Sequence, residues 1–322
     1  MYVIGIDAGG TKTVCQLANE TGTVVAEARG PGANLQAHGE LEVEKVLHGV
    51  MEQALCHSGT PAGGDPRELL PTVICLGIAG VDRPDDLEIV RGILRRIGYQ
   101  ARLLVVNDAL VALEAGLPGK PGVVVIAGTG SIAYGRNERS QAARSGGWGF
   151  VLGDEGSGYW IGRTALRAVL RETDRRGEPT SLTPRLLKHF GVATPQDLIH
   201  EVYYGGLRPT AIGALAPHVQ AAHEEGDAVA HGILDSAARE LSASALSVAS
   251  RLELIPGGTA FVLAGGVFRG VPWLVTELTQ RLTAEAPGST VTLLDVEPAR
   301  GAVQLALAEA RGGAKIPAYL SD

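Results

Sequence analysis

The first turn of the chain combines glycines, hydroxyl groups and a cation in an order that suits the binding of a phosphate. Gly9 and Gly10 follow a short β-branched strand and permit the positive φ angles of a tight hairpin, after which the chain alternates back into a second strand. Their backbone N–H groups can approach an anion closely, and Thr11, Lys12 and Thr13 would add two hydroxyls and a positive charge. An ordinary Gly-Gly hairpin is the alternative interpretation.

Asp7 lies at the end of the first predicted strand, where it would face the same anion. A carboxylate beside a phosphate is repulsive unless a cation lies between them. Mg²⁺ commonly accompanies protein-bound phosphates, and it is held by one or two carboxylates together with waters and the phosphates themselves. The position therefore predicts that Asp7 serves Mg²⁺.

The second half of the chain repeats this arrangement. A strand leads into a turn of Gly128, Thr129 and Gly130, and a returning strand begins at Ser131, which suggests an internal duplication. Backbone N–H groups and the two hydroxyls predict a second phosphate cradle. We exclude a dinucleotide fingerprint here and a P-loop at the first turn, because both motifs require a helix directly after the glycines.

Asn107 and Asp108 stand where a buried strand ends and a helix begins. In an α/β sheet this carboxyl edge is where ligands gather, so Asp108 is a candidate general base for an attacking hydroxyl group. Asp is also a favoured helix N-cap, and that structural role is the alternative.

Residues 145–160 have the most unusual composition in the chain, with six glycines around Trp148, Trp160 and an acidic pair. Such a density of glycine favours a ligand loop in which the backbone approaches the ligand and Asp154 bonds hydroxyl groups. A glycine-rich packing corner is the alternative.

Gly265 and Gly266 end a further predicted strand. Two glycines at this point suit the close approach of a flat ring such as adenine, and they suit a tight turn equally well.

Composition and charge restrict the class of protein. With 322 residues, 45% of them hydrophobic and 20% charged, the chain can form two globular domains. A net charge of −7 argues against a nucleic acid or an anionic membrane as the main partner, so we expect small-molecule ligands. The three cysteines, Cys15, Cys56 and Cys75, are expected to be buried thiols in a reducing compartment, and we expect a cytoplasmic protein without a signal peptide or membrane span.

The periodicity of the chain predicts an α/β architecture. An antiparallel meander opens the first half, a hairpin of two strands opens the second, buried strands alternate with helices in the first half, and residues 159–252 are mostly helical. We predict a first domain of residues 1–117 together with a C-terminal helix over 299–322, and a second domain of residues 118–298 with a helical insertion.

Taken together, five motifs resemble the BadF/BadG/BcrA/BcrD ATPase superfamily, and most closely its N-acetylglucosamine kinase branch. They cover nearly the whole chain in the expected order: Ile6–Thr13, Asn107–Ala109, Gly128–Ser131, Gly146–Ser157 and Leu263–Gly266. The resemblance implies two ribonuclease H-like domains of the actin and hexokinase type, with ATP and a sugar in the cleft between them. It also implies an ATP-dependent kinase acting on the 6-hydroxyl of an amino sugar, and we expect a homodimer.

Carried over to this chain, the resemblance implies specific roles. Asp7 would serve Mg²⁺ and Asp108 would be the general base. Residues 9–13 and 128–130 would contact the ATP phosphates, and Gly265-Gly266 the adenosine. The sugar would be lined by Asn34, Asn107, Asp108, Ser131, Gly147, Trp148 and Asp154.

One departure from the family's motifs leaves the identity of the sugar undecided. The animal N-acetylglucosamine kinases continue the second phosphate turn with an asparagine that touches the sugar, and here that position is Ile132. Glucosamine and a muramic-acid derivative therefore remain alternatives to N-acetylglucosamine. The other enzyme class in the superfamily, the iron–sulfur activator ATPases of acyl-CoA dehydratases and reductases, needs cluster cysteines at a subunit interface, and the cysteines here lie in predicted apolar strands and a helix. A sugar-sensing regulator would need a further domain.

Overall fold

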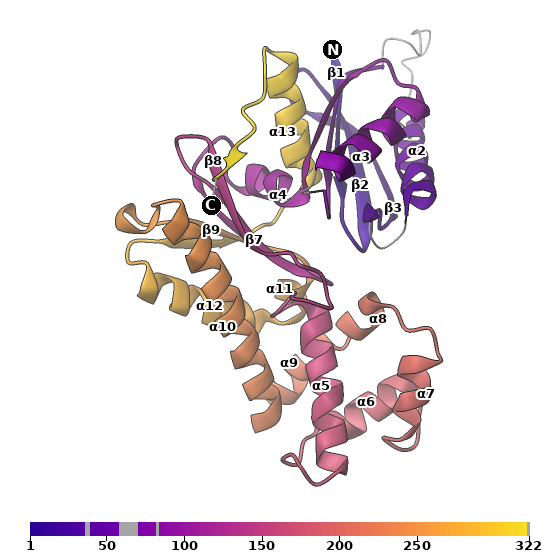
Figure 1. Ribbon diagram of the computed structural model, residues 1–322, viewed down its shortest axis with the longest axis vertical. Helices are drawn as coiled ribbons and strands as arrows, with labels where there is room; N and C mark the ends of the chain where they lie inside the picture. The colour runs from indigo at the N-terminus through magenta and orange to yellow at the C-terminus, as the bar shows by residue number, and fades with distance from the viewer. Residues whose placement is uncertain (36–38, 58–69, 82–83, 321–322) are drawn as a thin grey trace. The chain divides into compact units, whose positions relative to one another are not determined.

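The structure is a computed structural model that describes residues 1–35, 39–57, 70–81 and 84–320 (Figure 1). Contacts divide the chain into two compact units. The first unit comprises residues 1–122, 134–143 and 294–322, and the second comprises residues 123–133 and 144–293. Residues 321–322, with which the first predicted domain ends, lie outside the described residues.

The first unit is built on a five-stranded sheet of order β3-β2-β1-β4-β5. Its strands are β1 (Tyr2–Ala8), β2 (Lys12–Asn19), β3 (Val24–Pro31), β4 (Pro71–Ile78) and β5 (Arg102–Asn107). The predicted meander is confirmed, because β1 and β3 both pair antiparallel with β2. β4 and β5 extend the sheet in parallel beyond β1, as expected for buried apolar strands that alternate with helices.

Helices cover both faces of this sheet (Figure 1). α2 (Glu40–His57) and α3 (Pro84–Ile97) pack on one face, and α4 (Asp108–Gly116) and α13 (Ala299–Ala310) pack on the other. α13 approaches β1 very closely at Gly5, where a Cβ would lie 2.4 Å from the backbone nitrogen of Val303. Only glycine allows this approach, which lets an alanine-rich helix cover the centre of the sheet.

The second sheet has six strands in the order β10-β9-β6-β7-β8-β11. They are β6 (Gly122–Ala127), β7 (Ser131–Arg136), β8 (Gln141–Gly146), β9 (Ala260–Ala264), β10 (Thr290–Leu293) and β11 (Ala318–Tyr319). β6 and β10 each pair in parallel with β9. The strand that follows the second glycine turn is β7, so the exclusion of a dinucleotide fingerprint is confirmed.

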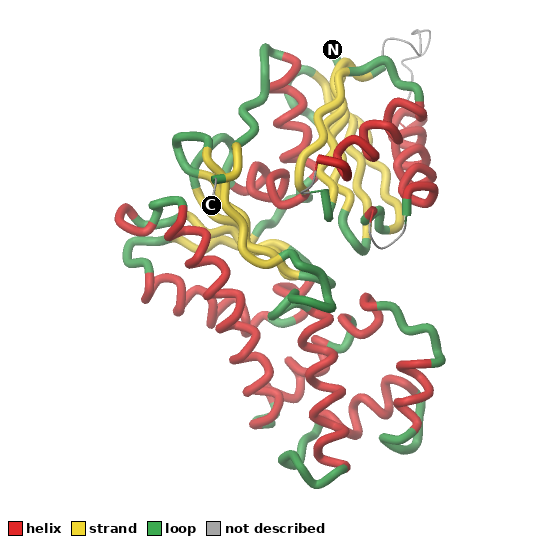
Figure 2. Tube along the Cα trace, in the orientation of Figure 1, coloured by secondary structure: helices red, strands yellow, loops and turns green. Residues whose placement is uncertain are grey.

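Helices make up most of the rest of the second unit (Figure 2). The predicted helical region is confirmed, and residues 214–215 separate α8 from α9. The helices are α5 (Gly158–Thr173), α6 (Leu182–Phe190), α7 (Asp197–Tyr203), α8 (Pro209–Gly213), α9 (Ala216–Glu224), α10 (Ala228–Arg251), α11 (Gly266–Gly270) and α12 (Pro272–Glu285).

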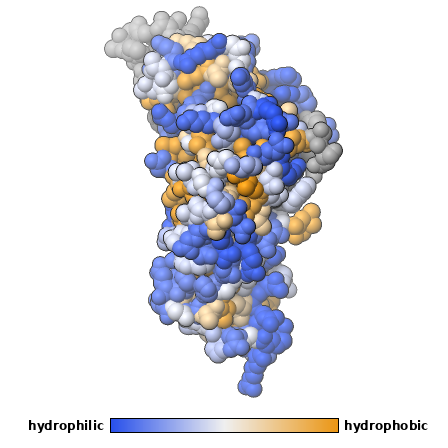
Figure 3. All heavy atoms as spheres, turned by 90° about the vertical axis from the view of Figure 1, so that its left-hand side faces the viewer, coloured by the Kyte–Doolittle hydropathy of each residue, from blue (hydrophilic) through white to orange (hydrophobic). Residues whose placement is uncertain are grey.

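The surface, the helices and the cysteines can be compared with the expectations that the composition gave. Hydrophilic residues cover much of the face drawn in Figure 3, and hydrophobic residues gather on it in small groups. Among the described residues, no helix has the length and apolarity needed to span a bilayer. All three cysteines are free thiols, and Cys15 and Cys75 are buried in β2 and β4. The expectation of burial is wrong for Cys56, which lies on an exposed position of α2.

Candidate active site

Two carboxylates meet at the carboxyl edge of the first sheet. The register pairs Ala8 with Ile78 and Ile78 with Asn107, so β1, β4 and β5 end side by side. This brings Asp7, the second-last residue of β1, towards Asp108, which follows β5. Burial and, to a smaller extent, the charges of Asp108 and Glu297 raise the pKa of the Asp7 carboxyl to about 8, although Lys12 opposes the shift. The site therefore disfavours a second negative charge unless a proton or a cation compensates it.

The structure assigns the helix cap at this edge to Asn107. Its side-chain Oδ1 accepts a hydrogen bond of 2.8 Å from the backbone N–H of Ala109, and its backbone is extended, as an N-cap requires. Asp108 is instead the first residue of α4. The capping alternative for Asp108 is therefore wrong, and its role as a base stays a prediction.

The first glycine turn does not have the positive φ angles that the sequence predicted. Neither Gly9 nor Gly10 has a positive φ angle, so the turn does not need glycine for its backbone conformation. At Gly10 a Cβ would meet nothing within 4 Å, and packing does not explain this glycine either. The open space leaves room for a ligand to reach the backbone. The carbonyl of Gly9 accepts a bond from the N–H of Ala33, which holds Asn34 close to the turn.

The two polar side chains after this turn have partners of their own. Thr13 is fully buried, and its hydroxyl donates to the carbonyl of Pro31 at 2.8 Å. This bond is structural, and we do not retain Thr13 among the phosphate donors. Lys12 Nζ lies 2.6 Å from Glu297 Oε2, and Arg29 lies 2.9 Å from the other carboxylate oxygen. Sequence reasoning missed Glu297 and Arg29, because no local pattern connects residues 285 positions apart.

The second glycine turn rests on a buried carboxylate. Asp154 Oδ1 accepts a bond of 3.3 Å from the backbone N–H of Ser131, and a Cβ on Gly130 would lie only 2.6 Å from Asp154 Oδ2. Burial raises the pKa of Asp154, with a smaller contribution from Glu155, while backbone hydrogen bonds oppose the shift. The side chain thus supports the turn, a role that the sequence did not predict. At Gly128, in contrast, a Cβ would meet nothing within 4 Å.

The glycine-rich loop continues from this turn. The N–H of Gly147 donates to the carbonyl of Ser131 at 3.0 Å, and a Cβ on Gly147 would lie 2.8 Å from the side chain of Ile132. Trp148 follows with 63% of its surface exposed. The Arg144 guanidinium lies 4.5 Å from the centre of the Trp148 ring and donates to the carbonyl of Gly146 at 2.8 Å. Arg144, which we did not predict, thereby fixes the start of the loop.

The two glycines that were predicted to contact adenosine have different surroundings. Gly265 has a φ of 110°, and its Cβ would lie 2.2 Å from the carbonyl oxygen of Ala127 in β6. Packing on the neighbouring strand therefore explains Gly265 fully. At Gly266 the space for a Cβ is empty, so Gly266 keeps the room that a ring would need.

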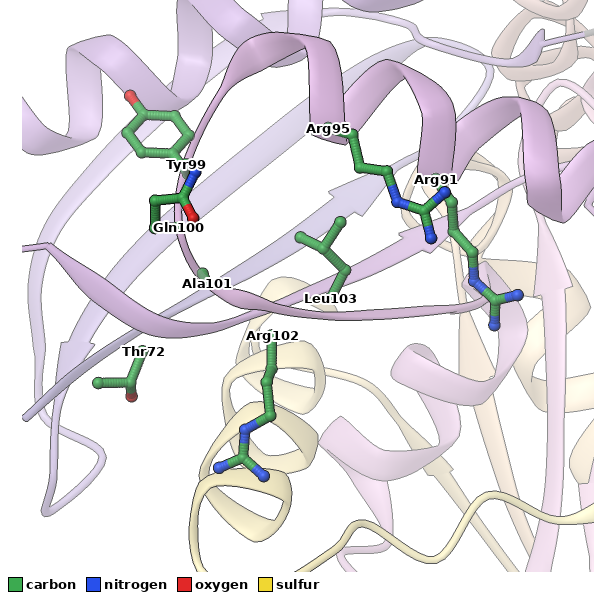
Figure 4. Close-up of a pocket in the computed structure, with 8 residues that line it drawn as sticks. All are labelled: Thr72, Arg91, Arg95, Tyr99, Gln100, Ala101, Arg102 and Leu103. Atoms are coloured by element: carbon green, nitrogen blue, oxygen red, sulfur yellow. The ribbon is translucent and has the colours of Figure 1, made fainter.

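Two hollows in the described part of the chain contain none of the predicted site residues. One, of about 800 Å³, lies beside the start of β5, where Arg91 and Arg95 project from α3 and Arg102 from the strand (Figure 4). Because Asp108 follows the end of β5, this hollow lies at the opposite end of the strand from the carboxylates. Another, of about 390 Å³, is lined by residues of α5 and α10. Neither of these two hollows therefore marks the candidate site.

The donor set suits Mg²⁺ better than a metal that needs a complete protein cage. Across the described ranges, no three His, Cys, Asp or Glu side chains converge as metal ligands. Mg²⁺ keeps several waters and binds through one or two carboxylates plus substrate phosphates. The buried Asp7 carboxylate beside Asp108 fits that requirement, since a cation would compensate the burial and the repulsion that raise the pKa of Asp7.

Known proteins resemble this chain over nearly its whole length. An N-acetylmuramic acid/N-acetylglucosamine kinase of Clostridium acetobutylicum is 38% identical over 309 residues, which cover 96% of this chain and 99% of that protein. An N-acetyl-D-glucosamine kinase of Dictyostelium discoideum is 34% identical and covers 94% of this chain, aligned over 97% of its own length.

Solved structures show the same architecture. A candidate N-acetylglucosamine kinase of Chromobacterium violaceum aligns with a TM-score of 0.72 and 28% identity, over 95% of this chain and 98% of that one. A ROK-family glucokinase of Streptomyces griseus aligns with a TM-score of 0.57 and 17% identity, over 97% of this chain and 100% of that one, which shows a shared fold alone. These likenesses confirm the predicted fold class. The model of the BadF/BadG/BcrA/BcrD ATPase family matches residues 4–306, and the chain belongs to that family.

Proposed function

We propose that this protein is a kinase that uses ATP to phosphorylate the 6-hydroxyl of an amino sugar, with N-acetylglucosamine as its principal acceptor. The relatives from Clostridium and Dictyostelium, both named for this sugar, support the substrate class. The observation that carries the chemistry is the pair of carboxylates, Asp7 and Asp108, at adjoining strand ends in the unit that also holds the open glycine turn.

In this proposal Asp108 is the general base. Its carboxylate accepts the proton of the sugar 6-hydroxyl while that oxygen forms a bond to the γ-phosphorus of ATP. The bond from the γ-phosphorus to the β,γ-bridging oxygen breaks, and ADP leaves. Mg²⁺, held through Asp7, would neutralise negative charge on the phosphates. The backbone N–H at Gly10, where no Cβ limits access, supplies a donor to those phosphates, and the missing Cβ at Gly128 leaves room for them beside the second turn.

We propose that the sugar is contacted by Asn34, Asn107, Ser131, Gly147 and Trp148. The exposed face of Trp148 offers a stacking surface for a sugar ring or its acetyl group, which accounts for a large aromatic side chain left open to solvent. We assign Asp154 mainly to support of the second turn, since its carboxylate binds the N–H of Ser131.

N-acetylmuramic acid is a second acceptor that one observation favours. Ile132 occupies the position where the animal kinases have a sugar-binding asparagine, and its side chain packs against Gly147. The Clostridium relative is named for both N-acetylmuramic acid and N-acetylglucosamine. An apolar residue at this point makes no demand for a hydrogen-bonding group on the sugar.

A coupled ADP-release assay with a panel of sugars tests the proposal. The panel contains N-acetylglucosamine, N-acetylmuramic acid, glucosamine and, as a control without nitrogen, glucose. We expect kcat/KM to be highest for an N-acetylated sugar, and the product to carry its phosphate on O6 by NMR. Failure to phosphorylate any of the three amino sugars would remove the proposed function.

We further propose Mg²⁺ as the cation, the cytoplasm as the compartment and a homodimer as the assembly. Free thiols at all three cysteines support a reducing compartment. Light scattering of the purified protein measures the mass of the assembly, and a mass near 33.4 kDa would exclude the dimer.

A further inference from the structure

Glu297 joins two cations of the first unit. It lies just before α13, and its Oε2 lies 2.6 Å from the ammonium of Lys12 at the start of β2. Its Oε1 lies 2.9 Å from Nη2 of Arg29 in β3. The carboxylate is one-quarter exposed and the lysine side chain somewhat less than half exposed. A segment far along the chain thus determines the direction of a cation beside the open glycine turn.

The contact leaves Lys12 able to bind another anion. A lysine ammonium has three N–H donors, and Glu297 uses one of them. The charge of Glu297 is also shared with Arg29, so Lys12 is not neutralised by a carboxylate of its own. Although burial would raise the pKa of Glu297, hydrogen bonds and charges of Lys12 and Arg29 lower it overall, and the group stays ionised at neutral pH. The arrangement therefore holds the lysine in place without cancelling its charge.

A long side chain loses conformational freedom when it binds a ligand, and a partner that holds it beforehand reduces that loss. Lys12 is unbranched and flexible, and it directly follows the turn whose open glycine we assign to a polyphosphate. Glu297 is the group that restricts it.

We propose that Glu297 is a positioning residue that holds Lys12 towards the phosphates of a nucleoside triphosphate. The proposal rests on the proposed function insofar as that function places the triphosphate at the first glycine turn. This role and a purely electrostatic role predict changes of opposite sign in nucleotide affinity. If Glu297 acted only as a negative charge near the phosphates, removing that charge would tighten nucleotide binding. If it positions Lys12, removing the charge weakens binding.

The test compares Glu297→Gln with Glu27→Gln, a matched control. Glu27 also binds Arg29, at 2.8 Å, but the structure records no contact of Glu27 with Lys12. Binding of the β,γ-imido analogue of ATP with Mg²⁺ is measured by calorimetry, and KM is measured for ATP and for the sugar. We expect Glu297→Gln to raise the dissociation constant of the analogue about tenfold, as is typical for a lost charge-assisted contact. Glu27→Gln should change it less than about twofold, and KM for the sugar should stay unchanged in both.

A double variant shows whether Glu297 acts through Lys12. In Lys12→Met, the further change Glu297→Gln should have no added effect on analogue binding, because the group that Glu297 positions is gone. Glu297→Asp keeps the charge and should restore part of the affinity. If Glu297→Gln proves unstable, Glu297→Asp is measured alone and combined with Lys12→Met instead, and it should weaken analogue binding only where Lys12 is present.

Three results would overturn the proposal. These are tighter or unchanged binding in Glu297→Gln, additive losses in the double variant, and a wild type that does not bind the analogue at all. Because the analogue binds without phosphoryl transfer, a protein that holds it in this lysine-dependent manner yet phosphorylates no amino sugar would leave Glu297 in its role. That outcome would remove the proposed substrate alone.

Discussion

The two glycine turns have the same sequence pattern but are supported in different ways. The turn at Gly9–Gly10 is preceded by Asp7 and followed by a lysine that Glu297 holds, so charged side chains surround it. In the turn at Gly128–Gly130 the position of Asp7 is taken by Ile126, and the turn is supported by one buried carboxylate and by N–H groups at the start of α5, which bond to the carbonyls of Gly128 and Thr129. The same hairpin pattern is thus surrounded by charged side chains in the first unit, whereas hydrogen bonds fix its conformation in the second.

The strongest test of this comparison exchanges one aspartate in each unit. Asp108→Asn removes the proposed base and should lower kcat by roughly 10²- to 10⁴-fold, with little change in KM. Asp154→Asn keeps an oxygen that can accept from Ser131 and should lower kcat by less than about tenfold. Steady-state kinetics of both variants with ATP and the sugar gives the result.

Asp85→Asn is the control for Asp108, since Asp85 also lies in the first turn of a helix, α3, and has no proposed chemistry. Its kcat should equal that of the wild type. Melting temperatures should shift little in Asp85→Asn and Asp108→Asn, because Asn107 is the residue that caps α4. Near-normal turnover in Asp108→Asn, with a large loss in Asp154→Asn, would mean that Asp154 and not Asp108 is the general base.

Asp7→Asn should separate activity from stability. Loss of the carboxylate should weaken the apparent Mg²⁺ affinity by roughly 10- to 100-fold. In the metal-free and nucleotide-free protein the same change should increase stability at neutral to alkaline pH. The folded-state pKa of Asp7 is raised to about 8 from an ordinary 3.8, so its contribution to stability is fully present below pH 4 and is lost as the pH rises towards 8.

The measurement is chemical denaturation at pH 5 and pH 8 in the presence of a chelator. The stability gain of Asp7→Asn over the wild type should be larger at pH 8 than at pH 5. An equal gain at both values would mean that the carboxylate is not held in a repulsive environment.

The glycines provide a smaller and more local test. Gly130→Ala places a methyl group against Asp154 and should destabilise the protein by about 1–3 kcal/mol. Gly10→Ala and Gly128→Ala meet open space at unstrained φ angles, so their stability should equal or slightly exceed that of the wild type. We nevertheless expect both to raise KM for ATP. Unchanged KM values for ATP would mean that the two turns do not bind its phosphates and are ordinary hairpins.

The smallest effect concerns the loop that carries Trp148. Arg144→Met removes a cation from the face of the ring, a contact of about 0.5–1 kcal/mol, and should raise KM for the sugar roughly two- to fivefold. KM for ATP should not change. Arg139→Met, a change of the same kind in the preceding turn, serves as the control, and an equal effect on both substrates would argue for general loosening of the unit.

The sequence was sufficient for the features that depend on local patterns. Apolar alternation and glycine turns predicted both hairpins, and the buried strand that ends at Asn107 predicted that Asp108 follows it at the carboxyl edge of a sheet. The same patterns could not show that the hydroxyl of Thr13 is used by Pro31 or that Cys56 faces solvent, since both depend on packing against distant elements. Neither could they connect Lys12 with Glu297 or Arg144 with the Trp148 ring in space, because such contacts follow from topology.

The return of residues 294–322 to the first unit has a consequence for biosynthesis. A ribosome releases β1 to β5 long before it makes α13, whose apolar face packs on β1 where Gly5 allows close approach. At 5–20 residues per second, roughly 10 to 35 seconds separate the two. During that interval one face of the nascent sheet lacks its central helix, and Lys12 lacks Glu297. The nascent first unit is therefore exposed to aggregation and to chaperones until α13 has emerged from the ribosome, and Glu297 can hold Lys12 only after that point.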